Sequence, residues 1–481
     1  MKKTKRLLAM LMAAVMAMGM LAGCGGGKTG DEEVTLTWYI MGDTTLRDNN
    51  EVFQMASDMV YEDLGYRLNI KPIDMASYSD KMKMIIAGGE EWDICWTSNW
   101  CNDYAANVSN GAYLQLDDLL DEVPALKESI NEKIWEGVKS NGGIYGVPVQ
   151  QIMARNSAVS MPLEFWEKYN DTLVNVKDYQ DMDAFMQAFG TDYPNIARVG
   201  FGWQNLMYDQ NIERIANPVA IDLEGPADEI KVYNMYETEK YKELILLRRE
   251  WTEKGYSRKG TDGNASTSNK KPEQEPWVID CYKPGYETMR EASVKYPVKA
   301  FTISDNYLTN DGIQATIHSI NYASKHPVEA LKFLEYANTT PEFVNLLVYG
   351  IEGKHYEKID DVTVRRTDTT GYQNSDWCIA NVFNTYVMEG QPADAHVQTK
   401  QMNDNAKTSR ILGFNLNRDA IKVQLANCIS VLNEYQAQLE EGLVENPEAV
   451  LNEMNAKLKA AGVDEVVAEV QRQIDEWLAN K

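Results

Sequence analysis

Three tryptophans and two cysteines stand within the stretch EEWDICWTSNWCND at residues 90–103. Cys95 and Cys101 have the chemistry of a metal pair or of a disulfide, and their spacing alone leaves both alternatives open. The tryptophans recur every four residues, which would also suit one stripe of a helix. A third interpretation is a buried strand that ends in a ligand-binding loop.

Metal and cofactor chemistry has little support elsewhere in the sequence. The four histidines are scattered, and no HExxH, paired CxxC or calcium-loop spacing occurs. AGCGGGKT at 22–29 fits a relaxed phosphate-loop pattern, but no predicted strand precedes it and no helix follows it. We therefore expect no metal, no cofactor and no catalytic residue.

The elements around the opening stretch alternate between strand and helix. The patterns predict strands over 34–42 and 66–74, and helices over 49–65 and 77–89, the second opening with a Ser77-to-Asp80 capping box. A third strand is then due, and WDICW has the continuous apolar character of a strand buried on both faces of a parallel sheet.

This order decides between the interpretations of the opening stretch. A helix through it would contain Thr97, Ser98 and Asn99, which are weak helix formers. We therefore expect a strand with Trp92 and Trp96 in the core, while Trp100 lies beyond the strand end. Cys95 becomes a small buried hydrophobe. A disulfide between the two cysteines stays an alternative.

Polar side chains follow each of the three strands. Ligands of open parallel sheets bind beyond the carboxyl ends of the strands. Asp43, Asp74, Ser98, Asn99 and Trp100 stand at those ends. Carboxylates, hydroxyls and amides hydrogen-bond sugar hydroxyl groups, and an indole face packs on sugar C–H surfaces. In the alternative reading, the two aspartates only cap the following helices and the tryptophan is an outer core residue.

A second sheet is predicted after GGIYGVPVQQIMARN at 142–156, where glycines and a proline mark a change of direction. An extended segment that bridges two lobes would have this composition. Gln150 and Arg155 in this segment are further candidates for ligand contact. Trp203, at the end of a strand predicted over 196–203, is another.

The N-terminus resembles a lipoprotein leader. A basic start and an apolar run too short for a permanent membrane span lead to LAGC at 21–24, which resembles a bacterial lipobox. The resemblance implies lipid attachment on Cys24 and removal of residues 1–23. The alternatives are an ordinary signal peptide or a retained anchor.

Charge narrows the choice of partners. The chain has a formal net charge of −25, and removal of the basic leader makes it more acidic still. Such a surface repels nucleic acid and anionic lipid headgroups. We therefore expect no nucleic-acid partner, and contact with the membrane only through the lipid anchor. Beyond Cys24 five cysteines remain, so no dense disulfide framework is implied.

Several motifs together resemble one family. The lipobox, GGIYGVP, SINYASKHPVEALKFLEYANTTPEF, YGIEGKHYE at 349–357 and the tail from GFNLN at 413–417 are similar to family 1 extracellular solute-binding proteins of ABC importers. More narrowly, they resemble the large Gram-positive lipoproteins with an extra C-terminal domain of uncharacterised function. Trp377 in WCIANVF stands where the family has an internal tryptophan, although the residues after it depart from the family pattern.

The resemblance implies an α/β, two-lobed periplasmic-binding-protein-like fold of type II with an appended C-terminal helical subdomain. The expected division is a signal peptide at 1–23, a tether at 24–33, a first lobe from 34–148 and 298–337, a second lobe from 149–297 and 338–412, and the subdomain at 413–481. Apolar periodicity in the tail independently predicts helices over 421–439, 447–458 and 466–478.

Function follows as an expectation. The resemblance implies a monomer that is lipid-anchored on the outer face of the cell membrane. It would capture a small solute, foremost an oligosaccharide, and deliver it to the permease subunits of an ABC transporter. The alternatives are a secreted glycoside hydrolase, a sensor for a signalling partner, and a peptide ligand in place of a sugar. Acidic residues are too abundant to single out a catalytic pair.

Overall fold

The computed structural model describes residues 33–194, 207–226, 229–256 and 271–480. Residues from Leu36 onward form one compact unit. Cys24, the leader and most of the expected tether lie outside the described residues. The strand expected over 196–203 lies outside them as well, and so does its candidate Trp203.

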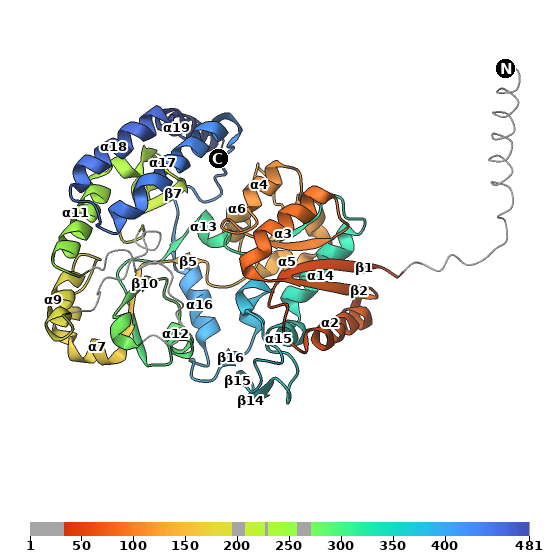
Figure 1. Cartoon of the computed structure of the whole chain (residues 1–481). Coiled ribbons are helices and arrows are strands. Elements are labelled where there is room, and N and C mark those ends of the chain that lie inside the picture. The colour runs from red at the N-terminus through yellow and green to blue at the C-terminus, as the bar shows by residue number, and fades with distance from the viewer. Residues whose placement is uncertain (1–32, 195–206, 227–228, 257–270, 481) are drawn as a thin grey trace, which may run out of the picture. The chain divides into compact units, whose positions relative to one another are not determined.

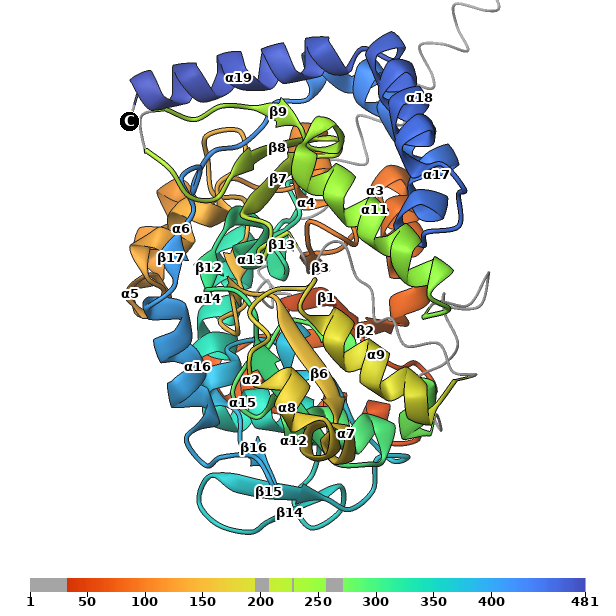
Figure 2. The same cartoon turned by 90° about the vertical axis from the view of Figure 1, so that its left-hand side faces the viewer.

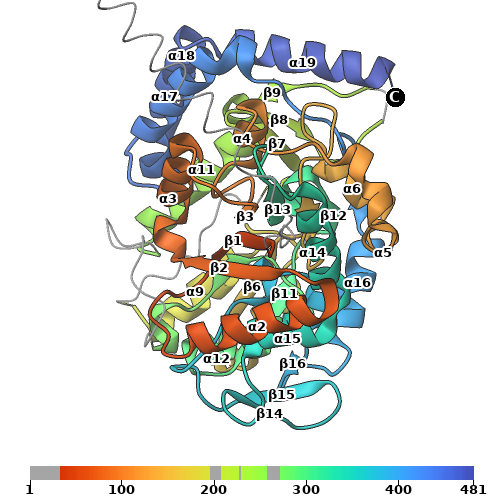
Figure 3. The same cartoon turned by 90° about the vertical axis from the view of Figure 1, so that its right-hand side faces the viewer.

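The central sheet carries the first candidate residues, and its strands run in the order β2, β1, β3, β13, β4. The first four of these strands are labelled in Figure 3. β1 (Thr35–Met41), β2 (Arg67–Ile73) and β3 (Ile94–Thr97) confirm the three predicted strands, and β1 pairs with β3 in parallel. β13 (Ile317–Ile320) lies antiparallel between β3 and β4 (Val147–Pro148). The β-α-β-α-β start is therefore confirmed, and an antiparallel strand is added to it.

Two helices connect the first three strands. α2 (Asn49–Leu64) packs on β2 and ends at Gly65, whose left-handed backbone (φ 81°) closes the helix (Figure 3). α3 (Met75–Gly88) begins two residues before Ser77, so the predicted capping box is wrong. The extended backbone of Asp74 already starts the helix there.

The second sheet begins after the segment at 142–156, as predicted, with β6 (Ala158–Pro162), and the segment itself contributes short strands to two other sheets. Within this segment, β4 belongs to the central sheet, whereas β5 (Ala154–Arg155) belongs to a separate three-stranded sheet. In that sheet β12 (Tyr307–Leu308) lies between β5 and β17 (Lys407–Thr408). The sheet to which each short strand belongs depends on pairing with distant segments, and local apolar patterns do not reveal such pairing.

A second three-stranded sheet and the helix α15 depart from the expected lobe boundaries. β6 (Ala158–Pro162) lies between β10 (Val278–Asp280) and β11 (Val298–Thr302), and both neighbours are antiparallel to it. β11 therefore belongs with the strands of the second lobe, although the expected boundary at 298 assigned it to the first. Conversely, α15 (Pro341–Tyr349) packs on α2, so this helix lies with the first lobe rather than with the second.

The remaining described elements connect these sheets. The helices are α4 (Tyr104–Ser109), α5 (Pro124–Ser129), α6 (Glu132–Val138), α7 (Leu163–Lys168), α8 (Asn170–Leu173), α9 (Met182–Asp192), α11 (Glu239–Glu253), α12 (Tyr286–Val294), α13 (Asn310–Ile313), α14 (Pro327–Thr339) and α16 (Ala395–Asp404). The further strands are β7 (Ile212–Ala216), β8 (Val219–Asp222), β9 (Tyr233–Asn234), β14 (Tyr356–Lys358), β15 (Thr363–Arg366) and β16 (Val387–Met388). Short 3-10 helices include Asp376–Cys378, which carries Trp377.

The C-terminal tail forms the three predicted helices, α17 (Lys422–Glu440), α18 (Pro447–Ala460) and α19 (Val463–Ala479). α17 and α18 pack on α11, and α19 lies beside β9 (Figures 1 and 2). Their apolar faces join two continuous cores with these neighbours. Polar contacts add to this, since Nε of Arg248 donates to the carbonyl oxygen of Glu440 at 2.7 Å. The tail is thus an integral part of the core that it covers.

Candidate functional site

The ends of β1 and β2 meet at one edge of the central sheet. The N–H of Gly42 donates to the carbonyl oxygen of Ile73 at 3.0 Å, so the residues that follow each strand lie side by side. Asp43 and Asp74 line one cavity of about 410 Å³, together with Gln373, Asn374 and Trp377. The structure thus brings together three candidates from three separate parts of the sequence.

Neither aspartate caps a helix through its side chain. Oδ1 of Asp43 accepts from the N–H of Thr45 at 2.7 Å and from its hydroxyl at 2.6 Å, and these bonds lower the pKa of Asp43. Asp74 accepts from the N–H of Thr44 at 3.2 Å and from its hydroxyl at 3.1 Å. Both carboxylates are therefore fixed in place, and each has further lone pairs for a hydroxyl-bearing ligand.

The tryptophans of the opening stretch separate as predicted. Trp96 is fully buried and Trp92 is 4 % exposed, whereas Trp100 is 51 % exposed. β3 ends at Thr97, which is why Trp100 leaves the core. Its Nε1 donates to the carbonyl oxygen of Ala315 at 2.9 Å, so the exposed ring is held in a defined orientation.

Trp377 completes an aromatic cluster. Its ring centroid lies 6.1 Å from that of Trp100 and 6.0 Å from that of Trp96, and Trp96 lies 5.4 Å from Trp100. The buried indole of Trp96 therefore supports two outer ones. Trp377 lines the cavity of the aspartates, whereas Trp100 is not among the described residues that line it. This combination of aromatic surface and carboxylates suits a ligand with both apolar faces and hydroxyl groups.

Ser98 and Asn99 support this cluster instead of facing the cavity of the aspartates. Ser98 is fully buried, and its hydroxyl oxygen accepts from the N–H groups of Trp100 at 3.2 Å and Cys101 at 2.8 Å. Asn99 donates to both the carbonyl oxygen and Oδ1 of Asp311 at 3.0 Å. These small polar residues after the buried strand thus use their hydrogen-bonding groups within the turn and on Asp311.

Asn99 and Asp311 line another cavity, of about 250 Å³, beside Glu213 and the start of the tail. Oε2 of the buried Glu213 accepts from the hydroxyl of Ser409 at 2.5 Å, and burial raises the pKa of Glu213 to about 8. This carboxyl lies outside the cavity that holds Asp43 and Asp74.

Gln150 and Arg155 are not brought to the cavity of the aspartates. Gln150 is buried and its amide donates to the hydroxyl of Ser129 at 3.3 Å. Arg155 is half-buried in β5, where it pairs with Tyr307 in the sheet register. Both residues lie on the chain that joins the sheets, which explains their apparent position between lobes in the sequence.

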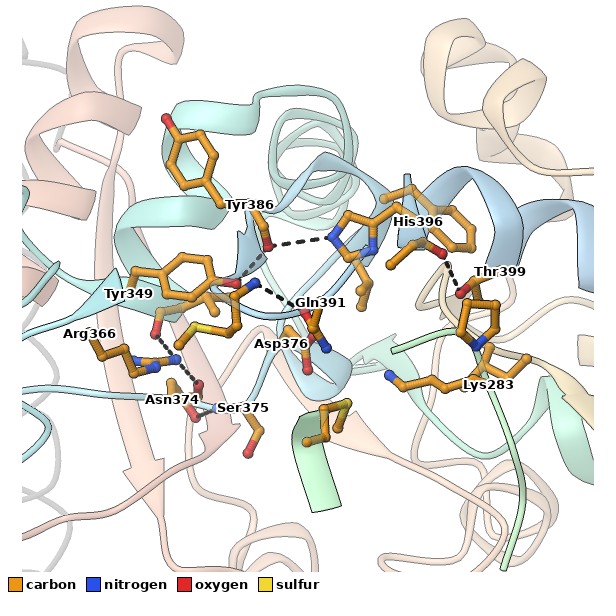
Figure 4. A pocket seen from close by; sticks show the side chains of 18 residues that line it. Lys283, Tyr349, Arg366, Asn374, Ser375, Asp376, Tyr386, Gln391, His396 and Thr399 are labelled. Carbon is orange, nitrogen blue, oxygen red and sulfur yellow. Dashed lines mark hydrogen bonds between the residues drawn. The ribbon is translucent and has the colours of Figure 1, made fainter. Parts of the chain in front are cut away.

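A smaller cavity of about 150 Å³ adjoins the loop before Trp377, which also lines the cavity of the aspartates (Figure 4). Asn374 and Ser375 line both cavities. Arg366 donates through Nη2 to the carbonyl oxygens of Val348 at 3.2 Å and Asn374 at 3.3 Å (Figure 4). Burial lowers the pKa of Arg366 and of His396, which also lines this cavity. Only the polar run QNSD before Trp377 could have suggested this loop from the sequence.

The described cysteines are free, including Cys95 and Cys101, so no disulfide joins those two. Burial raises the pKa of the Cys95 thiol to about 12, as expected for an unreactive core residue. Within the described ranges no cluster of His, Cys, Asp or Glu has the arrangement of a metal site. In the same ranges no helix is both long enough and apolar enough to span a membrane.

Comparison with known proteins adds to this geometry. Residues 410–479 match the family described as Domain of unknown function (DUF3502). The chain is 28 % identical over 485 residues to a carbohydrate ABC transporter substrate-binding protein of Streptococcus pneumoniae serotype 4 (strain ATCC BAA-334 / TIGR4), with 96 % of each chain covered.

Solved structures agree in fold. The N-glycan transport solute binding protein NgtS from Streptococcus pneumoniae superposes with a TM-score of 0.83 at 25 % identity, over 93 % of this chain and 100 % of that one. The Streptococcus pneumoniae substrate binding protein FusA in complex with kestose has a TM-score of 0.63 at 13 % identity, over 94 % and 100 %, and shares the fold alone. The class is thus the two-lobed α/β solute-binding fold of type II. The chain is thus similar over nearly its whole length to solute-binding proteins of ABC transporters, and its residues 410–479 match the DUF3502 family.

Proposed function

We propose that this protein captures an oligosaccharide in the cleft between its lobes and delivers it, chemically unchanged, to the permease subunits of an ABC transporter. The observation that carries the proposal is the pair of indoles Trp100 and Trp377, whose ring centroids lie 6.1 Å apart, with Trp377 in the cavity that Asp43 and Asp74 line. Indole faces cover the apolar faces of pyranose rings, and fixed carboxylates accept hydrogen bonds from their hydroxyl groups.

The relatives narrow the class of sugar. Structures of NgtS include complexes with Man1GlcNAc and with Man5GlcNAc. We propose a glycan of this type as the solute here. The residues around the larger cavity agree with an uncharged sugar, since its lining, within the described part of the chain, includes two aspartates and no lysine or arginine. A polyanionic glycan would meet charge repulsion at this site.

Hydrolysis is disfavoured by the state of the carboxyls. A glycosidase needs one carboxyl group that holds its proton near neutral pH, and burial away from hydrogen-bond donors is the usual way to achieve this. Asp43 has the opposite arrangement, because two bonds from Thr45 lower its pKa. Glu213, whose pKa is raised, lines a different cavity. We therefore propose binding without catalysis.

The anchoring and the lobes belong to the same proposal. We propose that the first lobe is built on the central sheet and the second on β6, β10 and β11, with residues 413–480 attached to the second. We propose that Cys24 carries the lipid that holds a monomer at the outer face of the cell membrane. A single lipidated protein close to its transporter needs no second membrane contact.

The test is calorimetric titration of the mature protein with Man1GlcNAc, Man5GlcNAc, other neutral oligosaccharides, an acidic oligosaccharide and short peptides, followed by chromatography of the mixture. We expect saturable one-to-one binding of a neutral glycan that is recovered intact. Cleavage of the glycan would overturn the proposal in favour of a hydrolase. Binding of peptides alone would overturn the assignment of the solute class.

A further inference from the structure

The motif YGIEGKHYE at 349–357 makes no direct contact with the cavity of the aspartates, yet its histidine is among the most enclosed polar residues of the chain. His355 is 1 % exposed. Its Nδ1 accepts from the N–H of Ile351 at 2.9 Å. The neutral ring therefore carries its proton on Nε2, which lies 3.0 Å from Oδ2 of Asp48 and donates to it.

Glycine is required beside this histidine. Gly350 has φ +83°, and a Cβ there would collide with the imidazole of His355. The ring of Tyr372 also lies near the imidazole, with centroids 5.9 Å apart. The motif thus encloses the imidazole of His355, and its Nε2 points toward Asp48, the residue just before α2.

Asp48 joins the start of α2 to a loop far along the chain. Its N–H donates to the carbonyl oxygen of Gly371 at 3.0 Å, while Arg47 bridges Asp48 at 3.0 Å and Asp368 at 2.7 Å. A Cβ at Gly371 would lie 2.7 Å from side-chain atoms of both Arg47 and Asp48. The loop that contains Gly371 therefore packs against these two side chains too closely for a larger residue. The bond from His355, followed by that from Arg47, holds the pKa of Asp48 well below its usual range.

The same loop leads directly into the site. The carbonyl oxygen of His355 accepts from the N–H groups of Thr367 at 2.8 Å and Asp368 at 3.2 Å. After Gly371, the N–H of Asn374 donates to Val348 at 3.1 Å, and the following turn presents Trp377. The side-chain amide of Asn374 lies close to Gly42, the residue before Asp43.

We propose that His355 and Asp48 are positioning residues of the ligand site, which fix the loop Gly371–Cys378 against the end of β1 so that Asn374 and Trp377 face Asp43 and Asp74. This inference rests on the proposed function for its binding readout. A supporting shell of this kind sets affinity because small displacements of a stacking ring lose contact area and hydrogen-bond geometry together.

The first experiment does not need a ligand. In protein labelled with 5-fluorotryptophan, the fluorine resonance of Trp377 is assigned from the Trp377→Phe variant. We expect His355→Ala to shift or split this resonance and to leave in place that of Trp135, which lies on α6. His355→Gln retains a donor toward Asp48 and should return the resonance part of the way. An unchanged Trp377 resonance in His355→Ala would overturn the inference even if no ligand were known.

The second experiment is a double-variant cycle on affinity for the tightest glycan. We expect His355→Ala to weaken binding by about tenfold in the wild-type background and by less than about twofold in the Trp377→Ala background, because the histidine acts through that ring. Equal losses in both backgrounds would overturn the inference. Absence of glycan binding by the wild type would instead contradict the proposed function, which separates the two failures.

A matched control separates positioning from stability. Tyr336 also holds a hydrogen bond to α2, from its hydroxyl to Oδ2 of Asp63 at 2.7 Å, but it lines none of the described cavities of the site. Tyr336→Phe should lower the melting temperature without a change in affinity. If it weakened binding as much as His355→Ala, the effect would be general destabilisation and the inference would be wrong.

Discussion

The ring centroids of Trp100 and Trp377 lie 6.1 Å apart, although the two residues are far apart in the sequence. Both rings lie against the buried indole of Trp96, with centroid distances of 5.4 and 6.0 Å. A fully buried side chain in a close-packed core cannot yield easily, so the two outer rings have a rigid base. Such a surface loses little conformational entropy when a sugar ring packs on it.

Trp100→Ala should weaken binding of the captured glycan by roughly 1–3 kcal/mol, because an exposed ring contributes to the complex and little to the folded state. Half of the Trp100 surface is accessible in the absence of ligand. Its unliganded melting temperature should therefore move little. Calorimetric titration and thermal unfolding of the same preparation measure the two effects.

Trp96→Ala is the matched control for this pair. Trp96 is fully buried, so its removal should cost roughly 3–5 kcal/mol of unfolding free energy. The two variants separate affinity from folding. Normal binding by Trp100→Ala together with early unfolding would mean that Trp100 serves the core and that the stacking role is wrong.

Glu213 makes stability depend on pH in a defined direction. Burial raises its pKa to about 8, with a further rise from Asp311 and an opposing effect of Arg410. The folded state therefore holds a proton that the unfolded chain releases above about pH 4. This contribution to stability is complete below that pH. It is lost as the pH rises toward about 8, at up to about 1.4 kcal/mol per pH unit.

Glu213→Gln should accordingly flatten the dependence of the unfolding free energy on pH between about 5 and 8. Urea unfolding of both proteins across this interval gives the comparison. Glu440, whose pKa burial raises to about 7, acts in the same direction in both proteins and cancels in the difference. Parallel curves for the variant and the wild type would show that Glu213 is ionised in the folded protein.

The DUF3502 region should contribute to stability as core rather than as a separate domain. Leu432 on α17 is buried in a cluster shared with Ile245 and Trp251 of α11. Leu432→Ala should lower the unfolding free energy by about 2–5 kcal/mol. Val423→Ala on the same helix, at a side chain that is 68 % exposed, should change it by less than about 0.5 kcal/mol. Equal stability of the two variants would indicate a tail that folds apart from its neighbours.

Cys24→Ser should release the protein from cells into the medium. The short basic and apolar leader ending in LAGC predicts that the lipid on this cysteine is the only membrane attachment. Cell fractionation and immunoblotting measure the distribution, with Cys101→Ser as the control that leaves the anchor intact. Retention of the Cys24 variant at the wild-type level would show that another segment holds the protein on the membrane.

The sequence predicted those parts of the fold that have a strong local pattern. Continuous apolar runs identified β3, alternation identified β2, and the order of elements placed Asp43, Asp74 and Trp100 at strand ends. The same logic separated Trp96 from Trp100, because a strand that is buried throughout must end before an accessible residue.

Long-range pairing set the limit of these predictions. No strand was predicted over Val298–Thr302, and pairing with β6 decides which sheet this segment joins. Gln373 and Asn374 enter the cavity because a loop anchored at Asp48 and Gly371 brings them there, and that anchor depends on residues far apart in the chain. Ser98 has a binding residue's chemistry, yet the turn beside it needs its hydroxyl.

The central claim is that the two accessible indoles bind an oligosaccharide. Calorimetric titration of the wild type and of the Trp100→Ala/Trp377→Ala double variant with the tightest glycan tests it most directly. We predict saturable one-to-one binding by the wild type and a loss of at least about a hundredfold in the double variant, whose circular dichroism should remain that of the folded protein. Binding of the folded double variant with wild-type affinity would contradict the claim and would place the solute elsewhere.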